Sequence, residues 1–244
     1  MPLLLNCDLG ESAGVGVMGM DEAVMPHIDQ ANIACGFHAG DPMVMQLTLK
    51  LAGEHDVMIG AHPGYSDLAG FGRRSIQHSP EEIVALMHYQ ISALDGMAKT
   101  QGLEMQYVKP HGALYNDMMV DADVRRAVMN SIAAFSRPVK LMLLATPWAD
   151  AHRAEAEQLG IELWFEAFAD RCYDDDGTLL SRAKPGAVHG REKMLHQAGQ
   201  LKNEGAVTTV SGHRLMIDAD TLCVHGDNTE GVQAIQDIRA LIDE

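Results

Sequence analysis

Seven short apolar runs alternate along this chain with longer amphipathic segments, and this alternation constrains the fold more than any other feature. It is the pattern expected of repeated β-α units around a parallel sheet. Seven strands favour a barrel over an open sheet, and a chain of 244 residues is long enough to form one as a single domain, 1–244. The predicted strands are residues 3–6, 28–34, 57–61, 105–108, 140–145, 162–166 and 222–224.

The helices between these strands begin with recognisable signals. Residues 79–82 read Ser-Pro-Glu-Glu, which combines an N-cap serine, a first-turn proline and a glutamate that can complete a capping box. The apolar residues from Ile83 to Leu94 then fall on one face of a helix. Asp41-Pro42 and Thr146-Pro147 repeat the combination of cap and proline.

Two more elements are predicted near the C-terminus. Val232, Ile235, Ile238 and Ile242 form the buried stripe of a closing helix. Between positions 207 and 218, the Ser-Gly pair at 211–212 indicates the turn of a hairpin placed before the last strand.

Charge and hydropathy narrow the class of partner. Eighteen Lys and Arg against 34 Asp and Glu give a net charge of −16, which has the wrong sign for binding nucleic acid. No apolar run approaches the length of a membrane span, and the N-terminus lacks the pattern of a signal peptide. We therefore expect a cytoplasmic protein without membrane contact. Free thiols are expected at Cys7, Cys35, Cys172 and Cys223.

Ionisable residues follow six of the seven predicted strands. They gather at 6–11, 35–41, 62–67, 109–115 and 166–173, and finally at 225–227. Taken singly, each group has an alternative interpretation as an ordinary cap or turn. In a barrel, however, all strand C-termini open on one face, so these groups are predicted to converge on a single pocket.

The chemistry of these residues allows more than one site. Histidine near neutral pH acts as a general acid or base, with an aspartate to hold its tautomer. Asp8, His38, His62, His111 and His225 also supply enough ligands for a divalent metal, although no HExxH motif or paired Cys/His spacing is present. The sequence also lacks a GxxxxGK[ST] motif, so ATP is not expected to bind here through a P-loop.

At these groups the sequence resembles the LamB/YcsF family, over essentially its whole length. The matching segments are 6–11 (Asn-Cys-Asp-Leu-Gly-Glu), 34–41 (Ala-Cys-Gly-Phe-His-Ala-Gly-Asp), 60–65 (Gly-Ala-His-Pro-Gly-Tyr), Asp67, 70–74 (Gly-Phe-Gly-Arg-Arg), 109–115 (Lys-Pro-His-Gly-Ala-Leu-Tyr), Glu166, 168–171 (Phe-Ala-Asp-Arg) and 223–227 (Cys-Val-His-Gly-Asp).

This resemblance implies a distorted seven-stranded β/α (TIM-like) barrel of the glycoside hydrolase/deacetylase type. It also implies the A subunit of an ATP-dependent 5-oxoprolinase, which acts with the B and C subunits. That enzyme converts 5-oxoproline, ATP and water to glutamate, ADP and phosphate. ATP, with Mg²⁺, would bind on this chain or on the partner subunits.

Given that reaction, residue chemistry assigns candidate roles within the site. His38 or His62 would pair with Asp8 to activate water, Lys109 and His111 would stabilise developing negative charge, and an arginine would bind the substrate carboxylate. No metal ligand is assigned. The predicted catalytic residues are Asp8, His38, His62, Lys109 and His111, and the predicted substrate-binding residues are Asn6, Asp41, Arg73, Arg74, Glu166, His225 and Asp227.

Two other functions stay open on the sequence alone. One is a metal-dependent deacetylase of the polysaccharide type, which the barrel kinship and the Asp and His groups favour. The low content of Phe, Trp and Tyr, 5% of the chain, counts against a groove for sugar polymers. The other is a non-catalytic subunit that binds a lactam without transforming it.

Overall fold

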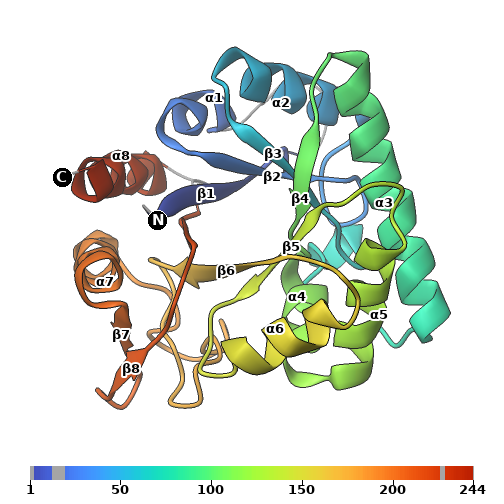
Figure 1. Cartoon of the computed structure of the whole chain (residues 1–244). Helices are drawn as coiled ribbons and strands as arrows, with labels where there is room; N and C mark the ends of the chain where they lie inside the picture. The colour runs from blue at the N-terminus through green and yellow to red at the C-terminus, as the bar shows by residue number, and fades with distance from the viewer. Residues whose placement is uncertain (1–2, 13–19, 226–228, 244) are drawn as a thin grey trace.

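Seven parallel strands close into a barrel at the centre of the molecule (Figure 1). The computed structural model describes residues 3–12, 20–225 and 229–243. Around the barrel the strands follow the order β1-β2-β3-β4-β5-β6-β9, and β9 pairs with both β1 and β6. Their bounds are β1 Leu4–Leu9, β2 Gln30–Ala34, β3 Met58–His62, β4 Met105–Val108, β5 Lys140–Leu144, β6 Leu163–Phe168 and β9 Thr221–Cys223.

All seven predicted strands are present, but three end later than predicted, β3 by the single residue His62. β1 continues to Leu9 because Asp8 and Leu9 still pair with Asn32 and Ile33 of β2. β6 continues past Glu166 to Phe168, because residues 167 and 168 pair with β9. As a result, Asp8 and His62 lie on strands and not in the loops after them, and Glu166 lies two residues before the end of β6.

Helices cover the outside of the barrel (Figure 1). α3 and α5 pack against each other on one side, where the apolar face of α3 is buried as predicted. The helices are α1 Asp21–Val24, η1 Met25–His27, α2 Pro42–Glu54, η2 Leu68–Gly70, α3 Pro80–Thr100, α4 Gly112–Val120, α5 Ala122–Ala133, α6 Ala149–Glu157, α7 Arg191–Glu204 and α8 Thr229–Asp243.

Two of the three predicted caps form. Ser79 and Glu82 make the capping box of α3, in which each side chain accepts a hydrogen bond from the other residue's backbone N–H. Asp41 caps α2. The prediction at Thr146-Pro147 was wrong in position, because α6 begins only at Ala149. Thr146 instead accepts a hydrogen bond from the backbone N–H of Trp148 in the preceding turn.

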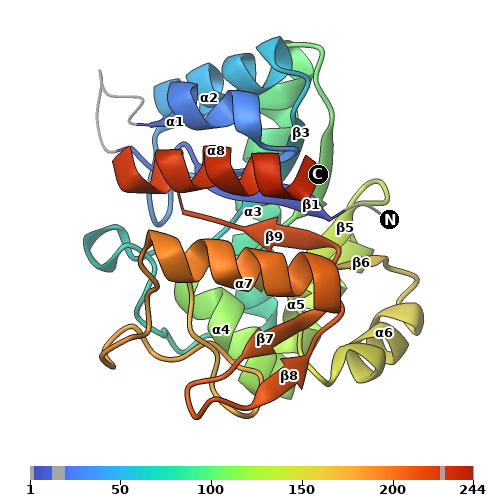
Figure 2. The same cartoon turned by 90° about the vertical axis from the view of Figure 1, so that its left-hand side faces the viewer.

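The connection from β6 to β9 is longer than the others and contains the predicted hairpin. β7 (Ala206–Thr208) and β8 (Arg214–Met216) pair in antiparallel fashion outside the barrel. Figure 2 shows β9 between α7 and α8, with the hairpin beside α7. Val232, Ile235 and Ile238 of α8 are buried, as predicted, whereas Ile242 is only partly buried. The helices α7 and α8 pack against each other.

The barrel interior is filled by a polar network where many β/α barrels have layers of branched apolar side chains. Asn6 lies at its centre. Its amide accepts a hydrogen bond from Asn32 at 2.8 Å and donates to Thr221 at 3.0 Å. Tyr107 donates to Asn32 at 2.7 Å, and Thr221 donates to Gln30 at 2.6 Å. Five buried polar side chains from β1, β2, β4 and β9 are therefore linked by hydrogen bonds, and within the described residues only Gln30 Nε2 among them lacks a partner.

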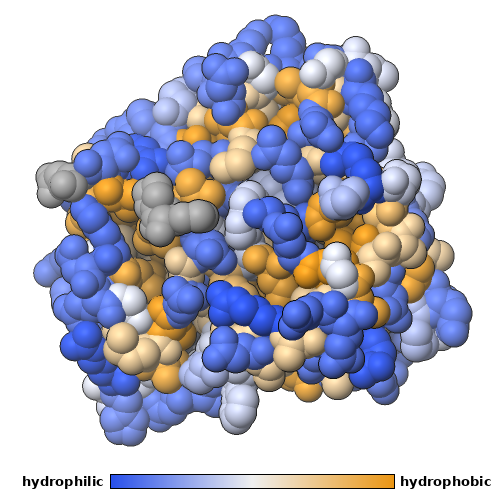
Figure 3. Space-filling view, in the orientation of Figure 1, coloured by the Kyte–Doolittle hydropathy of each residue, from blue (hydrophilic) through white to orange (hydrophobic). Residues whose placement is uncertain are grey.

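On the face drawn in Figure 3, hydrophilic residues cover most of the surface, with apolar side chains scattered between them. None of the helices in the described part of the chain is long and apolar enough to cross a membrane.

The Tyr107 ring leaves space for no side chain at Gly60 of β3. A Cβ at this position would overlap with the Tyr107 ring, which is fully buried and held by its hydrogen bond to Asn32. We expect Gly60→Ala to lower the free energy of unfolding by about 1–3 kcal/mol, measured by urea denaturation. Gly96→Ala is the matched control, because Gly96 lies exposed in α3 with open space at its Cβ. That control should stabilise the protein by up to about 1 kcal/mol. Equal unfolding midpoints for Gly60→Ala and the wild type would contradict the packing described.

Candidate functional site

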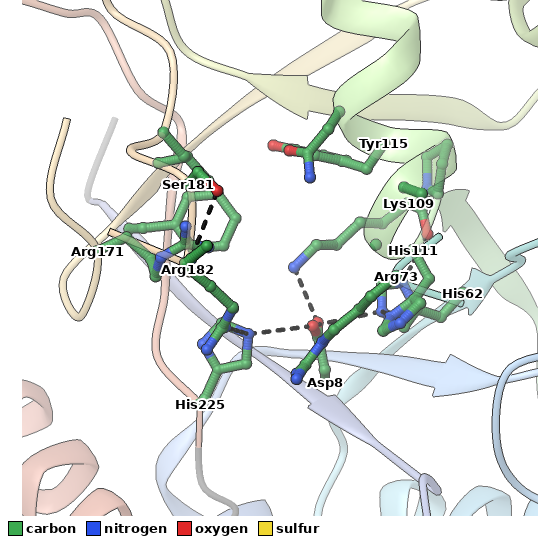
Figure 4. A pocket seen from close by; sticks show the side chains of 17 residues that line it. Asp8, His62, Arg73, Lys109, His111, Tyr115, Arg171, Ser181, Arg182 and His225 are labelled. Atoms are coloured by element: carbon green, nitrogen blue, oxygen red, sulfur yellow. Dashed lines mark hydrogen bonds and ion pairs between the residues drawn. The ribbon is translucent and has the colours of Figure 1, made fainter. Parts of the chain in front are cut away.

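A cavity of about 380 Å³ opens where the barrel strands end (Figure 4). Its walls come from residues far apart in sequence, as the barrel geometry predicts. A further wall is the segment 171–183, which follows β6. The ionisable residues that line it are Asp8, His62, Arg73, Lys109, His111, Tyr115, Arg171, Arg182 and His225.

Lys109 forms the charged floor of this pocket with two carboxylates. Its Nζ atom lies 2.8 Å from Asp8 Oδ1 and 2.6 Å from Glu166 Oε2. All three side chains are buried, and the other carboxylate oxygen of Glu166 accepts a hydrogen bond from the Tyr115 hydroxyl at 2.8 Å. The ammonium group thus joins β1 and β6 across the end of the barrel.

These groups hold one another in their charged forms. Burial by itself favours the neutral form of each. For Lys109 the carboxylates of Asp8 and Glu166 outweigh burial and raise its pKa well above the usual value. For Asp8 the nearby His62 and Lys109 outweigh burial and hold its pKa well below the usual value. The floor therefore carries a lysinium ion and an aspartate at neutral pH.

Two histidines flank the second oxygen of Asp8. His62 Nε2 lies 3.3 Å and His225 Nε2 3.7 Å from Asp8 Oδ2. The other ring nitrogen of His225, Nδ1, lies 2.6 Å from Asp170 Oδ2. Burial lowers the pKa of His225, but Asp170 and Asp8 outweigh it, and the net pKa is raised. An imidazole held by a carboxylate on one side and open to a pocket on the other is suited to proton transfer.

Three buried imidazoles gather around Glu11, next to this floor. Glu11 Oε1 lies 3.1 Å from His38 Nε2, 3.4 Å from His111 Nδ1 and 3.9 Å from His62 Nε2. Burial, followed by the neighbouring imidazoles, lowers the pKa of His111 to about 2. Burial also lowers the pKa of His38 well below its usual value, and burial together with Asp8 raises that of Glu11. His38 and His111 are therefore neutral at physiological pH.

Backbone carbonyls fix the orientation of two of these rings. His62 Nδ1 lies 2.7 Å from the Lys109 carbonyl oxygen, and His111 Nε2 lies 2.9 Å from that of Phe71. Gly72 makes the second contact possible. Its φ is +63°, and any Cβ would overlap with His38 and His111. The segment 70–74 can therefore lie directly against the imidazoles.

Arginines surround the pocket mouth. Figure 4 shows Arg171 and Arg182 on the side of His225 and Arg73 on the side of His62 and His111. Arg73 and Arg182 are exposed. Arg171 is buried and donates to the Leu180 carbonyl at 2.7 Å, and burial followed by repulsion from Arg182 lowers its pKa to about 10. A mouth lined by guanidinium groups favours an anionic ligand.

The structure brings most of the predicted site residues together. Asp8, His62, Arg73, Lys109, His111 and His225 line the pocket. Asn6, Glu166 and His38 lie beneath this lining, where they contact Lys109 or Glu11. Asp227 lies outside the described residues.

Two predicted substrate-binding residues lie elsewhere. Asp41 is the N-cap of α2, where its carboxylate accepts hydrogen bonds from the backbone N–H groups of Met43 and Val44 at 2.8 and 2.9 Å. Arg74 forms an ion pair with Asp67. Neither lines the cavity. For these two positions the alternative interpretation, an ordinary cap or turn contact, describes the structure.

Sequence reasoning missed five ionisable residues of the site, one of which, Tyr115, belongs to the polar group that follows β4. Glu11 and Asp170 belong to polar groups that follow β1 and β6, so the same argument that selected Asp8 and Glu166 applies to them. Arg171 lies beside Asp170 in sequence. Arg182 gives no such signal, because it lies in the middle of a long loop, away from any strand end.

Comparison with known proteins matches residues 3–244 to the model of the LamB/YcsF family. The chain belongs to the LamB/YcsF family. A Pseudomonas fluorescens member, named as the A subunit of 5-oxoprolinase, is 53% identical over 243 residues, with 99% of this chain and 97% of that protein covered. A Chromohalobacter salexigens member of the same name is 52% identical, with 100% and 98% covered.

A solved structure agrees with this assignment. The crystal structure of a protein named Lactam Utilization Protein, from Thermus thermophilus, matches with a TM-score of 0.89 and 38% sequence identity. The match covers 100% of this chain and 98% of that one. Both the LamB/YcsF resemblance and the TIM-like barrel predicted from the sequence are confirmed.

Loss of the Lys109 charge should destabilise this LamB/YcsF chain strongly. Lys109→Met leaves the carboxylates of Asp8 and Glu166 buried without their cation, so we expect the free energy of unfolding to fall by about 3–5 kcal/mol. Adding Glu166→Gln removes one of the two uncompensated charges and should recover part of this loss. Urea denaturation of the single and double variants measures both values. A Lys109→Met protein as stable as the wild type would show that the three groups are not coupled.

The pKa of His225 should lie above the ordinary value for histidine. Because Asp170 raises its pKa, Asp170→Asn should lower it. Because the pKa is raised in the folded state, the His225–Asp170 contact should make its full contribution to stability at pH values below the unfolded-state pKa of histidine. This contribution is lost as the pH rises through the raised folded-state value. NMR titration of the ring, assigned by comparison with His225→Gln, measures the pKa. An unchanged pKa in Asp170→Asn would rule out Asp170 as the cause.

Proposed function

We propose that this chain is the A subunit of an ATP-dependent 5-oxoprolinase and contributes the pocket in which the lactam ring of 5-oxoproline is opened to give L-glutamate. The family membership and the names of the relatives support the assignment. The observation that carries it is the arrangement of His225 between Asp170 and Asp8 above a buried lysinium ion, in a cavity with a cationic mouth.

The pocket suits the parts of this substrate. 5-Oxoproline carries a carboxylate, and the exposed Arg73 and Arg182 offer guanidinium groups to bind it. The polar lactam faces the opposite end of the pocket, where Asp8 can accept a hydrogen bond from the ring N–H. The cavity of about 380 Å³ lies in the range typical of small-molecule sites.

The reaction also explains why a proton-transfer histidine is needed. An unstrained lactam is a poor electrophile, and transfer of a phosphoryl group from ATP to its oxygen creates a leaving group at the ring carbon. Water then adds to that carbon, and the C–N bond breaks as the ring nitrogen takes up a proton and leaves as the amine. The γ-glutamyl phosphate that results is hydrolysed by a second water to glutamate and phosphate. We assign the removal of the water proton to His225 Nε2, with Asp170 stabilising the imidazolium that forms. Lys109 keeps Asp8 ionised and in place.

We assign the phosphorylation step to the complex as a whole. The B and C subunits, the partners that the family resemblance implies, contribute to it, and ATP with Mg²⁺ binds on them or at a site shared with this chain. The cationic residues Arg73, Arg171 and Arg182 are the groups of this pocket that fit a phosphorylated lactam. This chain then completes ring opening.

A metal-dependent deacetylase remains the second candidate, because His62 and His111 converge on Glu11 in a hydrolase-like barrel. It differs from the first candidate in needing neither ATP nor partner subunits. Release of acetate from an acetylated sugar by this chain alone would favour it.

Reconstitution tests the first candidate. We expect ATP-dependent release of glutamate from 5-oxoproline when the chain is mixed with the B and C subunits, and none from the chain alone. His225→Gln should lower kcat by about 10²-fold or more, because it removes the proton acceptor. Absence of glutamate from every mixture of folded subunits would contradict the proposal.

Arg73 and Arg74 provide a matched pair in the same assay. Arg73→Gln should raise KM for 5-oxoproline, because Arg73 lines the cavity. Arg74→Gln should leave KM close to the wild-type value, because Arg74 lies outside it and pairs with Asp67. Equal effects of the two changes would refute the placement of the substrate carboxylate.

A further inference from the structure

Two imidazole nitrogens in the pocket wall face each other at close range. His62 Nε2 and His111 Nδ1 lie 2.9 Å apart. The outer nitrogen of each ring contacts a backbone carbonyl, of Lys109 and of Phe71, and a carbonyl oxygen only accepts hydrogen bonds. Each outer nitrogen therefore carries the N–H, and in the neutral rings both inner nitrogens present lone pairs to each other.

Carboxylate oxygens add to this concentration of lone pairs. Glu11 Oε1 lies 3.4 Å from His111 Nδ1 and 3.9 Å from His62 Nε2, and Asp8 Oδ2 lies 3.3 Å from His62 Nε2. Electron-pair donors at these distances repel one another unless a cation lies among them. A proton on His62 Nε2 can remove the repulsion in only one of these contacts at a time. A metal ion bound by all three atoms removes the repulsion of His62 Nε2 from both Glu11 and His111.

The spacing of the donors fits a tetrahedral ion. Two ligand atoms that each lie about 2.1 Å from a tetrahedral Zn²⁺ are about 3.4 Å from each other. The three separations among His62 Nε2, His111 Nδ1 and Glu11 Oε1 are 2.9, 3.4 and 3.9 Å, and they bracket that value. The rings of His62 and His111 are perpendicular, so their lone pairs converge from different directions. Carbonyl partners on the outer nitrogens are also the usual orienting contacts of metal-binding histidines.

We propose that this cluster is a binding site for a divalent transition-metal ion of the zinc class, held by His62 Nε2, His111 Nδ1 and Glu11 Oε1. Two imidazoles and one carboxylate favour such an ion over Mg²⁺, which prefers oxygen ligands. Because His62 and His111 line the cavity, the fourth position faces the pocket and is open to water or to an oxygen of a substrate. The site is defined by these contacts alone and does not depend on the proposed reaction.

His38 has a positioning role in this site. Its ring lies parallel to that of His111, with centroids 3.6 Å apart, so the two rings cannot point their lone pairs at one ion. His38 Nε2 instead lies 3.1 Å from Glu11 Oε1 and orients the carboxylate.

A second group of possible ligands on the other side of the pocket does not need an ion. Asp8, Cys223 and His225 also lie close together. There, however, the Lys109 ammonium group already lies 2.8 Å from Asp8 Oδ1 and 3.3 Å from Cys223 Sγ and supplies the positive charge. This contrast makes His225 a control residue for metal binding.

Metal binding by the full chain, produced without a histidine tag, tests the proposal. After removal of metal with a chelator, the protein is titrated with Zn²⁺ against a chromophoric competitor, and bound metal is counted by mass spectrometry. We expect about one Zn²⁺ per chain. Co²⁺ in its place should give the strong visible absorption of a four-coordinate ion.

The variants separate ligands from neighbours. His62→Ala and His111→Ala should weaken Zn²⁺ binding by more than about 100-fold, and His38→Ala by about 10–100-fold. His225→Gln should retain close to wild-type affinity. Circular dichroism confirms that each variant is folded, and Glu11→Gln, which keeps the shape of the side chain, provides a ligand change with little risk to folding.

Three outcomes would overturn the proposal. The first is a folded wild-type chain that binds no metal. The second is a metal that stays bound in His62→Ala and His111→Ala. The third is a loss of Zn²⁺ affinity in His225→Gln equal to that in the two ligand variants. In the first case the charge among these nitrogens is a proton. None of these results depends on glutamate release, so the metal site and the proposed reaction can fail separately.

Discussion

The rest of this structure depends on the ion pairs that the Lys109 ammonium group forms with two carboxylates. This ammonium group lies buried between Asp8 on β1 and Glu166 on β6, at the end of a closed barrel. Burying an ion costs several kcal/mol unless its partners are close and well oriented. The barrel meets that condition because strands distant in sequence bring both carboxylates to the same ammonium. Fold and site are therefore coupled, since the strands that close the barrel also place the charged floor of the pocket.

This floor divides the pocket into two chemically different sides. On one side, His225 is held by Asp170 and has a raised pKa, which suits the transfer of a proton. On the other, His62 and His111 have their lone pairs turned inward by backbone carbonyls, which suits the binding of a cation. Asp8 contacts both sides through one oxygen, and Lys109 keeps it ionised. The polar interior of the barrel supports this arrangement from below, where Asn6 contacts Lys109.

The sequence was sufficient to predict the barrel and much of its pocket. Hydrophobic alternation located all seven strands, and the geometry of a barrel turned polar groups after distant strands into one predicted site. Asp8, His62, Lys109, His111 and His225 meet there because each lies at or beside a strand end.

The failures have physical causes that a single sequence does not display. Asp41 precedes a proline and caps a helix, and Arg74 pairs with Asp67, so local contacts take both residues away from the pocket. Arg182 reaches the pocket through the path of a long loop, which no periodicity encodes. The sequence also left the metal question open, because the tautomers of His62 and His111 follow from carbonyls that only the folded backbone brings near.

The most direct test of this account is a crystal structure of the chain with 5-oxoproline. The account predicts the ligand in the cavity, with its carboxylate against Arg73 or Arg182 and its lactam ring beside Asp8 and His225. Such a structure would place the substrate on the charged floor that Lys109 organises. Ligand density at any other place on the molecule, with this cavity holding only water, would contradict the central claim that this pocket is where the lactam is opened.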